Sequence, residues 1–178
     1  MIDLHCHVLP GIDDGPADLP TAVEMVRAYE ADGVQVIVAT PHLRSDFPGV
    51  VPGDLEAHCL ALATAAERPS LRIVPGGEVA LSWAIEASDD ELRAVSLDGR
   101  GSDLLVETPP NPLVPGVERA LFELAVRGYR ITLAHPELSP AFRKHPDRLS
   151  ALVARRRRWP GPARWRPVNQ VRSGRKQP

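Results

Sequence analysis

Apolar runs rich in β-branched residues alternate with helix-like segments along most of the chain. Five such runs predict buried parallel strands, and they cover residues 1–4, 34–40, 71–79, 103–108 and 130–136. Four segments with helical character lie between or after them, at residues 19–33, 54–67, 117–129 and 146–155. Gly33 is expected to end the first helix and Asp54 to cap the second, while the segment from Ala80 to about Leu97 is ambiguous. The alternation predicts an α/β fold with a parallel sheet, either open or closed into a barrel.

A histidine or a glutamate stands at the C-terminal end of each of the five predicted strands. In the order of the strands these residues are His5 and His7, His42, Glu78, Glu107 and His135. All are residue types that bind metal ions, and the carboxyl ends of barrel strands meet at the rim that carries the active site. Each residue taken alone has an ordinary explanation, such as a loop histidine, but five strands with the same feature favour a shared metal site.

The ligand types indicate the kind of metal site. Nitrogen and carboxylate donors without a thiolate suit manganese, iron or zinc in a multinuclear cluster better than a structural zinc ion. Such clusters produce hydroxide at neutral pH and hold an oxyanion while it is attacked. Hydrolysis of a phosphate ester is therefore the predicted chemistry.

The first strand and the turn after it, IDLHCHVLPGIDDG, carry the densest group of candidate ligands. His5 and His7 share one face of the strand because side chains alternate, so Cys6 points the other way. We expect Cys6 to be a buried structural cysteine, with a thiolate ligand as the alternative. Asp13 and Asp14 lie in a turn sequence, where one of the pair caps the next helix or shapes the turn while the other binds metal. Asp14 is the predicted ligand.

The composition is that of one globular domain. The 178 residues are 43% hydrophobic and 25% charged, which allows a sizeable buried core. No apolar run approaches the length of about 18 residues that a membrane span needs, and no leader opens the chain, so the cytoplasm is the default location. Two cysteines without a CxxC pair exclude a disulfide framework. The chain has neither the Cys-x5-Arg loop of cysteine phosphatases nor a GxxxxGK[ST] phosphate loop.

Several motifs occur in the order of a known family. They are DLHCHVLPGIDDG, EMVRAYEADGVQVIVATPH, GGEV, LLVETP and LFELAVRGYRITLAHPE. Through them, residues 1–153 resemble the PHP metallohydrolases, and most of all the manganese-dependent bacterial protein-tyrosine phosphatases of capsule and exopolysaccharide gene clusters. A bare DxHxH motif is shared by many amidohydrolase-like enzymes, whereas LPGIDDG together with ATPH and AHPE is far more specific.

The resemblance implies a distorted seven-stranded β/α barrel (TIM-like, PHP) that holds two or three Mn²⁺ ions, with Fe or Zn as alternatives. The implied ligands are His5, His7 and Glu78 for one ion, Glu78, Glu107 and His135 for a second, and Asp14 with His42 for a third. The implied activity is that of a phosphotyrosine-protein phosphatase, in which a metal-activated hydroxide attacks phosphorus and the phenolate leaves with little protonation. The implied partner is a phosphotyrosine protein, for which a bacterial tyrosine kinase of polysaccharide export is the candidate, and nucleic acid is not expected.

Two features depart from the family pattern. The family reads AHPER where this chain reads AHPEL, so Leu138 replaces an arginine well placed to hold the substrate phosphate. Arg44 and Arg143 are the candidates to replace it. The later βα units of the family and their Asp-x-His motif have no counterpart here, so we expect residues 1–154 to form a partial barrel with weakened metal binding and reduced or absent activity.

Residues 155–178 differ in kind from the residues before them. Residues 1–154 hold all 23 acidic and 12 of the 21 basic residues, a net charge of −11, whereas the last 24 residues contain no acid. Such a basic segment, rich in proline and tryptophan, cannot bury a core and is expected to be disordered. It resembles GC-rich DNA read in the wrong frame, and the alternative is a genuine tail for nucleic acid or a membrane surface.

Two other classes of function stay open at the level of sequence. One is a different PHP phosphoesterase, such as a histidinol-phosphatase-like enzyme, which a panel of phosphate esters would distinguish. The other is a non-catalytic remnant that binds metal or nucleic acid. Titration of a tail-deleted protein with DNA would test the nucleic-acid alternative.

Overall fold

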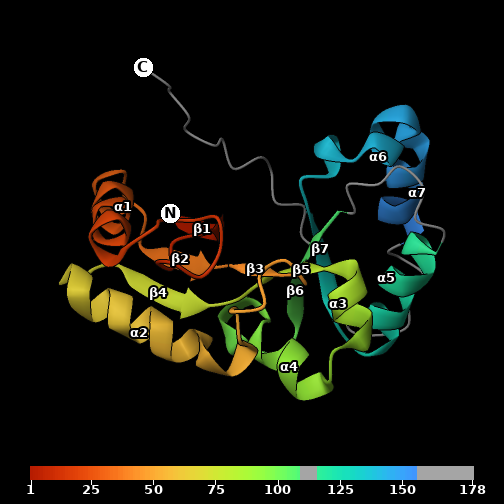
Figure 1. The fold of residues 1–178 in the computed structure, drawn as a ribbon. Coiled ribbons are helices and arrows are strands. Elements are labelled where there is room, and N and C mark those ends of the chain that lie inside the picture. The colour runs from red at the N-terminus through yellow and green to blue at the C-terminus, as the bar shows by residue number, and fades with distance from the viewer. Residues whose placement is uncertain (109–115, 156–178) are drawn as a thin grey trace.

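Short parallel strands form two sheets in the computed structural model, which describes residues 1–108 and 116–155 (Figure 1). The strands are β1 (Ile2–Cys6), β2 (Val36–Ala39), β3 (His42–Leu43), β4 (Arg72–Pro75), β5 (Glu78–Ala80), β6 (Asp103–Glu107) and β7 (Arg130–Ala134). The first sheet has the order β1-β2-β4 and the second has the order β3-β5-β6-β7, and every pairing is parallel. The predicted α/β fold with parallel strands is therefore confirmed. The predicted tail lies outside the described residues, apart from Arg155.

Two segments of the chain cross from the first sheet to the second. Thr40 and Pro41 separate β2 from β3, and Gly76 and Gly77 separate β4 from β5. A Cβ atom on Gly76 would lie 2.7 Å from Val38 Cγ1, and one on Gly77 would lie 2.5 Å from Leu43 Cδ2. Only glycine fits at these two positions, because real Cβ atoms do not approach other atoms so closely. The single strand predicted for residues 71–79 is thus two strands with a bend between them.

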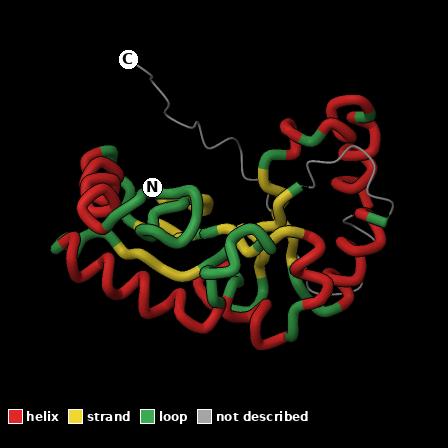
Figure 2. The backbone as a smooth tube through the Cα atoms, viewed as in Figure 1, coloured by secondary structure: helices red, strands yellow, loops and turns green. Residues whose placement is uncertain are grey.

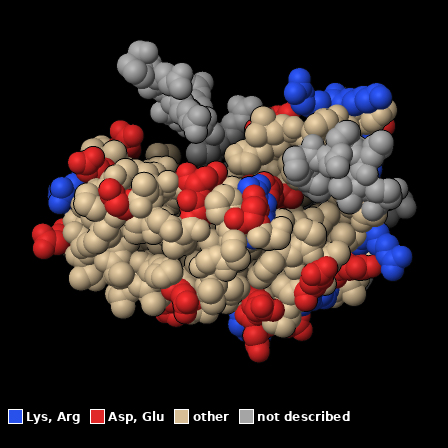
Figure 3. Space-filling model, viewed as in Figure 1, with Lys and Arg blue, Asp and Glu red and all other residues tan. Residues whose placement is uncertain are grey.

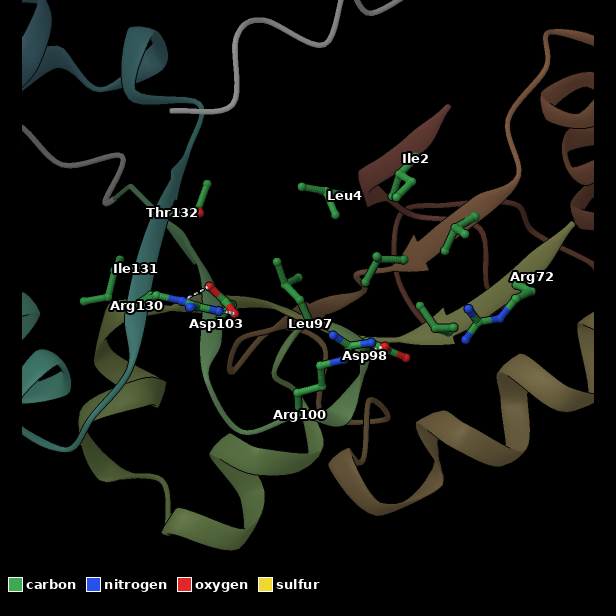
Figure 4. Close-up of a pocket in the computed structure, with 13 residues that line it drawn as sticks. Ile2, Leu4, Arg72, Leu97, Asp98, Arg100, Asp103, Arg130, Ile131 and Thr132 are labelled. Carbon is green, nitrogen blue, oxygen red and sulfur yellow. Dashed lines mark hydrogen bonds and ion pairs between the residues drawn. The ribbon is translucent and has the colours of Figure 1, made fainter. Parts of the chain in front are cut away.

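The expected barrel is not closed by the described residues. Among them, β1 pairs only with β2 and β7 pairs only with β6, so each of these outer strands has one edge without a backbone partner. A cavity of about 550 Å³ lies between the two sheets and is lined by apolar side chains such as Ile2, Leu4 and Val74 (Figure 4). Arg130 pairs with Asp103, and Arg100 with Asp98, on the walls of this cavity. A closed barrel requires the two outer edges to meet, and the seven strands described here do not bring them together.

Helices flank the two sheets (Figures 1 and 2). They are α1 (Leu19–Ala31), α2 (Leu55–Ala66), α3 (Leu81–Glu86), α4 (Asp89–Ala94), α5 (Val117–Val126), α6 (Pro140–Lys144) and α7 (Pro146–Arg155). The first pair of helices packs together, with α2 against β4, and α5 packs against α3 and β7. Their apolar faces and the strands form one buried core that includes Val26, Ile37, Leu62, Leu104 and Leu124.

The helix predictions were correct for α1, α2, α5 and α7, whereas three short helices were not predicted. The helices α3, α4 and α6 have only five or six residues each, too few to show a clear helical period. Asp54 occupies the N-cap position of α2 as predicted, but its side chain makes no capping hydrogen bond, and a 3₁₀ turn over Pro52–Asp54 precedes the helix. The first helix, α1, is capped by Asp18, which accepts a hydrogen bond from the Thr21 backbone N–H at 2.9 Å.

The surface in view carries more acidic than basic groups near the N-terminal helices. Figure 3 shows Asp and Glu side chains over the α1 and α2 side, while Lys and Arg side chains gather near α6 and α7. This distribution agrees with the acidic excess that the sequence predicts for residues 1–154. No helix within the described ranges has both the length and the apolar character needed to cross a membrane.

We predict that Gly77→Ala destabilises the protein by about 1–3 kcal/mol, because the added methyl group overpacks Leu43 and Val95 at the bend. Urea unfolding followed by circular dichroism measures the change in the midpoint. Gly53→Ala is the matched control, because a Cβ atom there meets nothing within 4 Å, and it is expected to change stability by less than about 0.5 kcal/mol. Equal midpoints for the two variants would contradict the role assigned to the bend.

Candidate metal centre

The carboxylate of Glu78 lies at the centre of a group of histidines, at the junction of the two sheets. Its side chain is fully buried, with a relative accessibility of 0%. Glu78 Oε2 lies 3.0 Å from His5 Nε2 and 3.1 Å from His7 Nε2. The same oxygen is 3.4 Å from His42 Nδ1, and the other oxygen is 3.8 Å from His135 Nε2. Four histidines from three separate segments of the chain therefore face one carboxylate.

The strand bends bring these residues together. His42 is the first residue of β3 and pairs in register with Glu78, the first residue of β5. His5 lies in β1, Glu107 is the last residue of β6, and His135 directly follows β7. The prediction that every candidate follows the end of a strand thus needs correction for His42 and Glu78, which begin short strands. The reason is that the strands before these two residues end at Ala39 and Pro75, and the chain then starts a new strand in the second sheet.

Asp13 holds His7 in a fixed orientation. Asp13 Oδ2 lies 2.7 Å from His7 Nδ1, so that His7 Nε2 faces Glu78. The same carboxylate accepts hydrogen bonds from the backbone N–H groups of Gly15, at 3.0 Å, and of His42, at 3.1 Å. A histidine that binds metal through one ring nitrogen commonly has the other nitrogen bound to a carboxylate in this way. The sequence alone did not separate this role from helix capping, and the structure shows that Asp13 shapes the turn.

Asp14 points toward the histidines from the other side of the same turn. Its Oδ1 lies 3.4 Å from His7 Nδ1 and 3.6 Å from His42 Nε2, and its side chain is 63% exposed. Neither Asp13 nor Asp14 caps the following helix, since Asp18 does so. The division of roles predicted for the pair is therefore consistent with the geometry, with Asp14 free to offer an oxygen to a cation.

All seven predicted ligands fall into groups whose donor atoms lie within 4.8 Å of one another. The groups are His5, Glu78 and His135; His7, Asp14 and His42; and His42, Glu78 and Glu107. Glu78 and His42 each belong to two groups, so the groups form one continuous cluster. The resemblance implied a different division, with His5 beside His7 and Glu107 beside His135. How the ligands are shared among ions stays a prediction.

Glu107 also contacts Arg44, and the sequence did not predict this contact. Arg44 Nη1 donates a hydrogen bond to Glu107 Oε1 at 2.7 Å. Arg44 directly follows β3, so the bend that places His42 in the cluster also brings this guanidinium to its edge. Arg44 is one of the two arginines that the sequence offered in place of the family arginine at position 138, but no sequence pattern predicted its contact with Glu107.

Other residues singled out in the sequence lie outside the cluster. Cys6 is buried and its thiol lies 3.4 Å from the Tyr29 hydroxyl, on the far side of β1 from His5 and His7. Burial raises the pKa of the Cys6 thiol to about 12, and its buried position outside the three donor groups agrees with the expected structural cysteine. Asp3 accepts a hydrogen bond from the His5 backbone N–H at 3.1 Å and belongs to none of the three groups. Leu138 is 65% exposed in a 3₁₀ turn and offers no charge.

The charges of the cluster depend on one another. Burial acts to raise the pKa of Glu78, but its hydrogen bonds with His5 and His7 outweigh burial and hold that pKa below its usual range. Burial also acts to lower the pKa of His7, but hydrogen bonds with Asp13 and Glu78 outweigh it and raise that pKa to about 9. A metal ion must displace this proton, because only neutral imidazole binds metal.

The donor set fits a multinuclear metal centre. Glu78 Oε1 and His42 Nδ1 are buried and have no hydrogen-bond partner among the described residues. Buried polar atoms are normally paired with a hydrogen bond or an ion. Imidazole and carboxylate donors without a thiolate suit Mn, Fe or Zn. The residues therefore fit a cation cluster centred on Glu78.

The known proteins that this chain resembles belong to one family. Residues 1–156 match the family model described as capsular polysaccharide synthesis, CpsB/CapC. Tyrosine-protein phosphatase YwqE of Bacillus subtilis (strain 168) is 32% identical over 155 residues, which are 86% of this chain and 61% of that protein. Tyrosine-protein phosphatase CpsB of Streptococcus agalactiae serotype III (strain NEM316) is 39% identical over 156 residues, covering 86% of this chain and 63% of that protein. The chain thus spans about three fifths of the length of these relatives.

A solved structure supports the same comparison. It comes from work on YwqE of Bacillus subtilis and CpsB of Streptococcus pneumoniae, described as unique metal-dependent tyrosine phosphatases. The match has a TM-score of 0.72 at 30% sequence identity and covers 86% of this chain and 62% of the other. The arrangement of strands and helices is therefore shared over most of the present chain.

We predict that Asp13→Asn lowers Mn²⁺ affinity by about 10- to 100-fold, because an amide holds His7 less firmly than a carboxylate does. Isothermal titration calorimetry of the purified chain with Mn²⁺ measures this change. Asp32→Asn, at the exposed end of α1, is the control and should leave the affinity unchanged. Unchanged affinity in Asp13→Asn would mean that the hydrogen bond to His7 does not support metal binding.

We also predict that the thermal stability of the chelator-treated protein falls as the pH rises from 6.5 toward 9. The folded-state pKa of His7, about 9, lies above its ordinary value of 6.5, so its contribution is complete below pH 6.5 and is lost on the way to pH 9. Mn²⁺ should reverse this trend, because deprotonation of His7 favours metal binding. Melting curves across this pH range test both statements. His145→Gln should keep the decline and His7→Gln should lose it, and a decline that persists in His7→Gln would assign it to another group.

Proposed function

Because this chain belongs to the CpsB/CapC family of capsular polysaccharide synthesis, we propose that it is a metal-dependent protein-tyrosine phosphatase. The observation that carries the proposal is one cluster of seven residues with nitrogen or oxygen donors, with the buried carboxylate of Glu78 at its centre. The names of its relatives support phosphotyrosine over other phosphate esters, since YwqE and CpsB are both named tyrosine-protein phosphatases. The family resemblance predicted from the sequence motifs is confirmed.

The proposed cofactor is Mn²⁺, in two or three ions held by His5, His7, Asp14, His42, Glu78, Glu107 and His135. When bound, the ions supply Lewis-acid activation of water and of the phosphoryl group. The solved relatives are described as metal-dependent, and the donor types suit manganese as well as iron or zinc. Glu78 would hold two ions together, because it belongs to two of the three donor groups.

The protein's own residues set the orientation of the donors. Asp13 directs His7 Nε2 toward Glu78, and Glu78 in turn holds His5 through its Oε2. Thr108 Oγ1 lies 2.9 Å from the carbonyl oxygen of Ala134 and 3.0 Å from that of His135, which ties the end of β6 to the turn that presents His135. A donor set held in this way is organised before the ions and the substrate arrive, which is the condition for efficient catalysis.

We propose phosphotyrosine as the substrate group for a chemical reason as well. The phenolate of tyrosine has a pKa of about 10 and leaves with little protonation, so the site needs no dedicated general acid. Among the described residues, the cluster consists of the seven donors with Asp13 and Arg44 beside them. The proposed partner is a phosphotyrosine protein of the capsule or exopolysaccharide machinery, and a bacterial tyrosine kinase of polysaccharide export is the candidate.

We propose further that residues 1–154 form one metallohydrolase domain built on the barrel plan. The unpaired edges of β1 and β7 and the apolar cavity between the sheets support this plan, because additional strands would cover both. The relatives are longer than this chain, which spans 61–63% of their length. Strands outside the described residues are therefore needed to close the barrel that the resemblance implies.

We predict that the purified chain hydrolyses a phosphotyrosine peptide when Mn²⁺ is added and that a chelator abolishes the turnover. Glu78→Gln should reduce kcat/KM by about 100-fold or more, because the amide removes the negative charge that two groups of ligands share. Phosphate release is the measurement, with His145→Gln, an exposed histidine outside the cluster, as the control. Absence of Mn²⁺-dependent turnover by the unmodified chain would sink the proposal for this chain.

A further inference from the structure

Arg44 is a basic residue that forms an ion pair with one of the candidate metal ligands, Glu107. Among the described residues, no other Lys or Arg forms an ion pair with any of the seven donors. Arg44 Nη1 donates to Glu107 Oε1 at 2.7 Å, and the Arg44 side chain is 28% exposed. The guanidinium therefore touches the cluster on one side and solvent on the other.

Two further contacts fix the plane of the guanidinium. Arg44 Nε and Nη2 donate to the two carboxylate oxygens of Asp46, each at 2.9 Å, in a bidentate pair. The Arg44 Cζ atom lies 5.2 Å from the centre of the Phe47 ring. Phe47 in turn stacks on His42, with ring centres 5.3 Å apart and an angle of 7° between the planes. Arg44 thus contacts one candidate metal ligand, Glu107, directly, and a second one, His42, through Phe47.

The hydrogen bonds leave part of the guanidinium available. A guanidinium has five N–H donors, and three of them are used, two by Asp46 and one by Glu107. The remaining donors belong to the two terminal nitrogens. The N–H groups of a planar guanidinium match the oxygens of a phosphate better than the ammonium group of a lysine does.

We propose that Arg44 binds the phosphoryl oxygens of the substrate at the metal centre. This proposal rests on the proposed function, since it names the group that receives the phosphate of the same site. Glu107 has a second carboxylate oxygen, through which it would hold an ion while its Oε1 accepts the hydrogen bond from Arg44. Leu138, which is exposed and uncharged, cannot supply this positive charge.

The competing explanation is that Arg44 only neutralises and orients Glu107. In that case its loss would weaken metal binding and leave the affinity of the loaded centre for phosphate unchanged. Substrate binding predicts the opposite pattern, with phosphate affinity lost and metal affinity kept. The two roles are therefore separated by measuring the two affinities independently.

The experiment uses the full chain and inorganic phosphate as the probe. Calorimetry measures the Mn²⁺ affinity without phosphate, and then the phosphate affinity of the Mn²⁺-saturated protein. In Arg44→Gln we expect phosphate affinity to fall about 10- to 100-fold, because a charge-assisted pair of hydrogen bonds is lost, while Mn²⁺ affinity changes less than about threefold. KM for a phosphotyrosine peptide should rise with the phosphate dissociation constant. Arg119→Gln, which removes an exposed arginine on α5, is the matched control.

Arg44→Lys keeps the result interpretable if Arg44→Gln folds poorly. Lysine retains the charge without the planar fork, so we expect it to restore only part of the phosphate affinity. Loss of Mn²⁺ affinity with unchanged phosphate affinity would overturn the proposal, as would full phosphate affinity in both variants. Failure of the proposed function looks different, because the unmodified chain would then bind phosphate with Mn²⁺ present and show no turnover. The comparison of Arg44 variants by calorimetry would still decide the role of Arg44 in that case.

Discussion

The buried negative charge of Glu78 is the constraint on which the rest of the structure depends. A fully buried carboxylate is costly unless positive charge or hydrogen-bond donors surround it. His5 and His7 bind one of its oxygens, and His42 and His135 approach from the second sheet. The energy of burying this group is recovered only when segments from β1, β3, β5 and β7 meet at one point. The cluster is therefore a structural requirement as well as a candidate catalytic centre.

The bends between the two sheets make that meeting possible. A straight strand through residues 71–79 would keep Glu78 in line with β4, away from His42 and Glu107. Gly76 and Gly77 allow the chain to turn where Val38 and Leu43 leave no room for a Cβ atom. The register after the bend then pairs Glu78 with His42 and with Leu105 of β6. Local backbone freedom and the chemistry of the site are thus linked through two glycines.

Residues around the donors complete the electrostatic design. Asp13 fixes one side of the cluster by binding His7 and the backbone of His42. Arg44 fixes another part of the cluster by binding Glu107, and Asp46 and Phe47 hold Arg44 in turn. Asp13 adds a negative charge beside the donors, and Arg44 adds a positive charge. Under the proposed function, Arg44 would attract the substrate phosphate and the carboxylates would attract the cations.

The sequence by itself determined the order of strands and main helices and the residue types of the cluster. These features depend on local patterns, namely apolar runs, helical periodicity and a His or Glu after each run. Only the tertiary structure decided where the strands break, how the seven donors are grouped, that Asp13 orients His7, and that Arg44 reaches Glu107. These depend on contacts between residues such as Arg44 and Glu107, which are 63 positions apart. No local pattern encodes such a distance, because it follows from the bend of one strand against another.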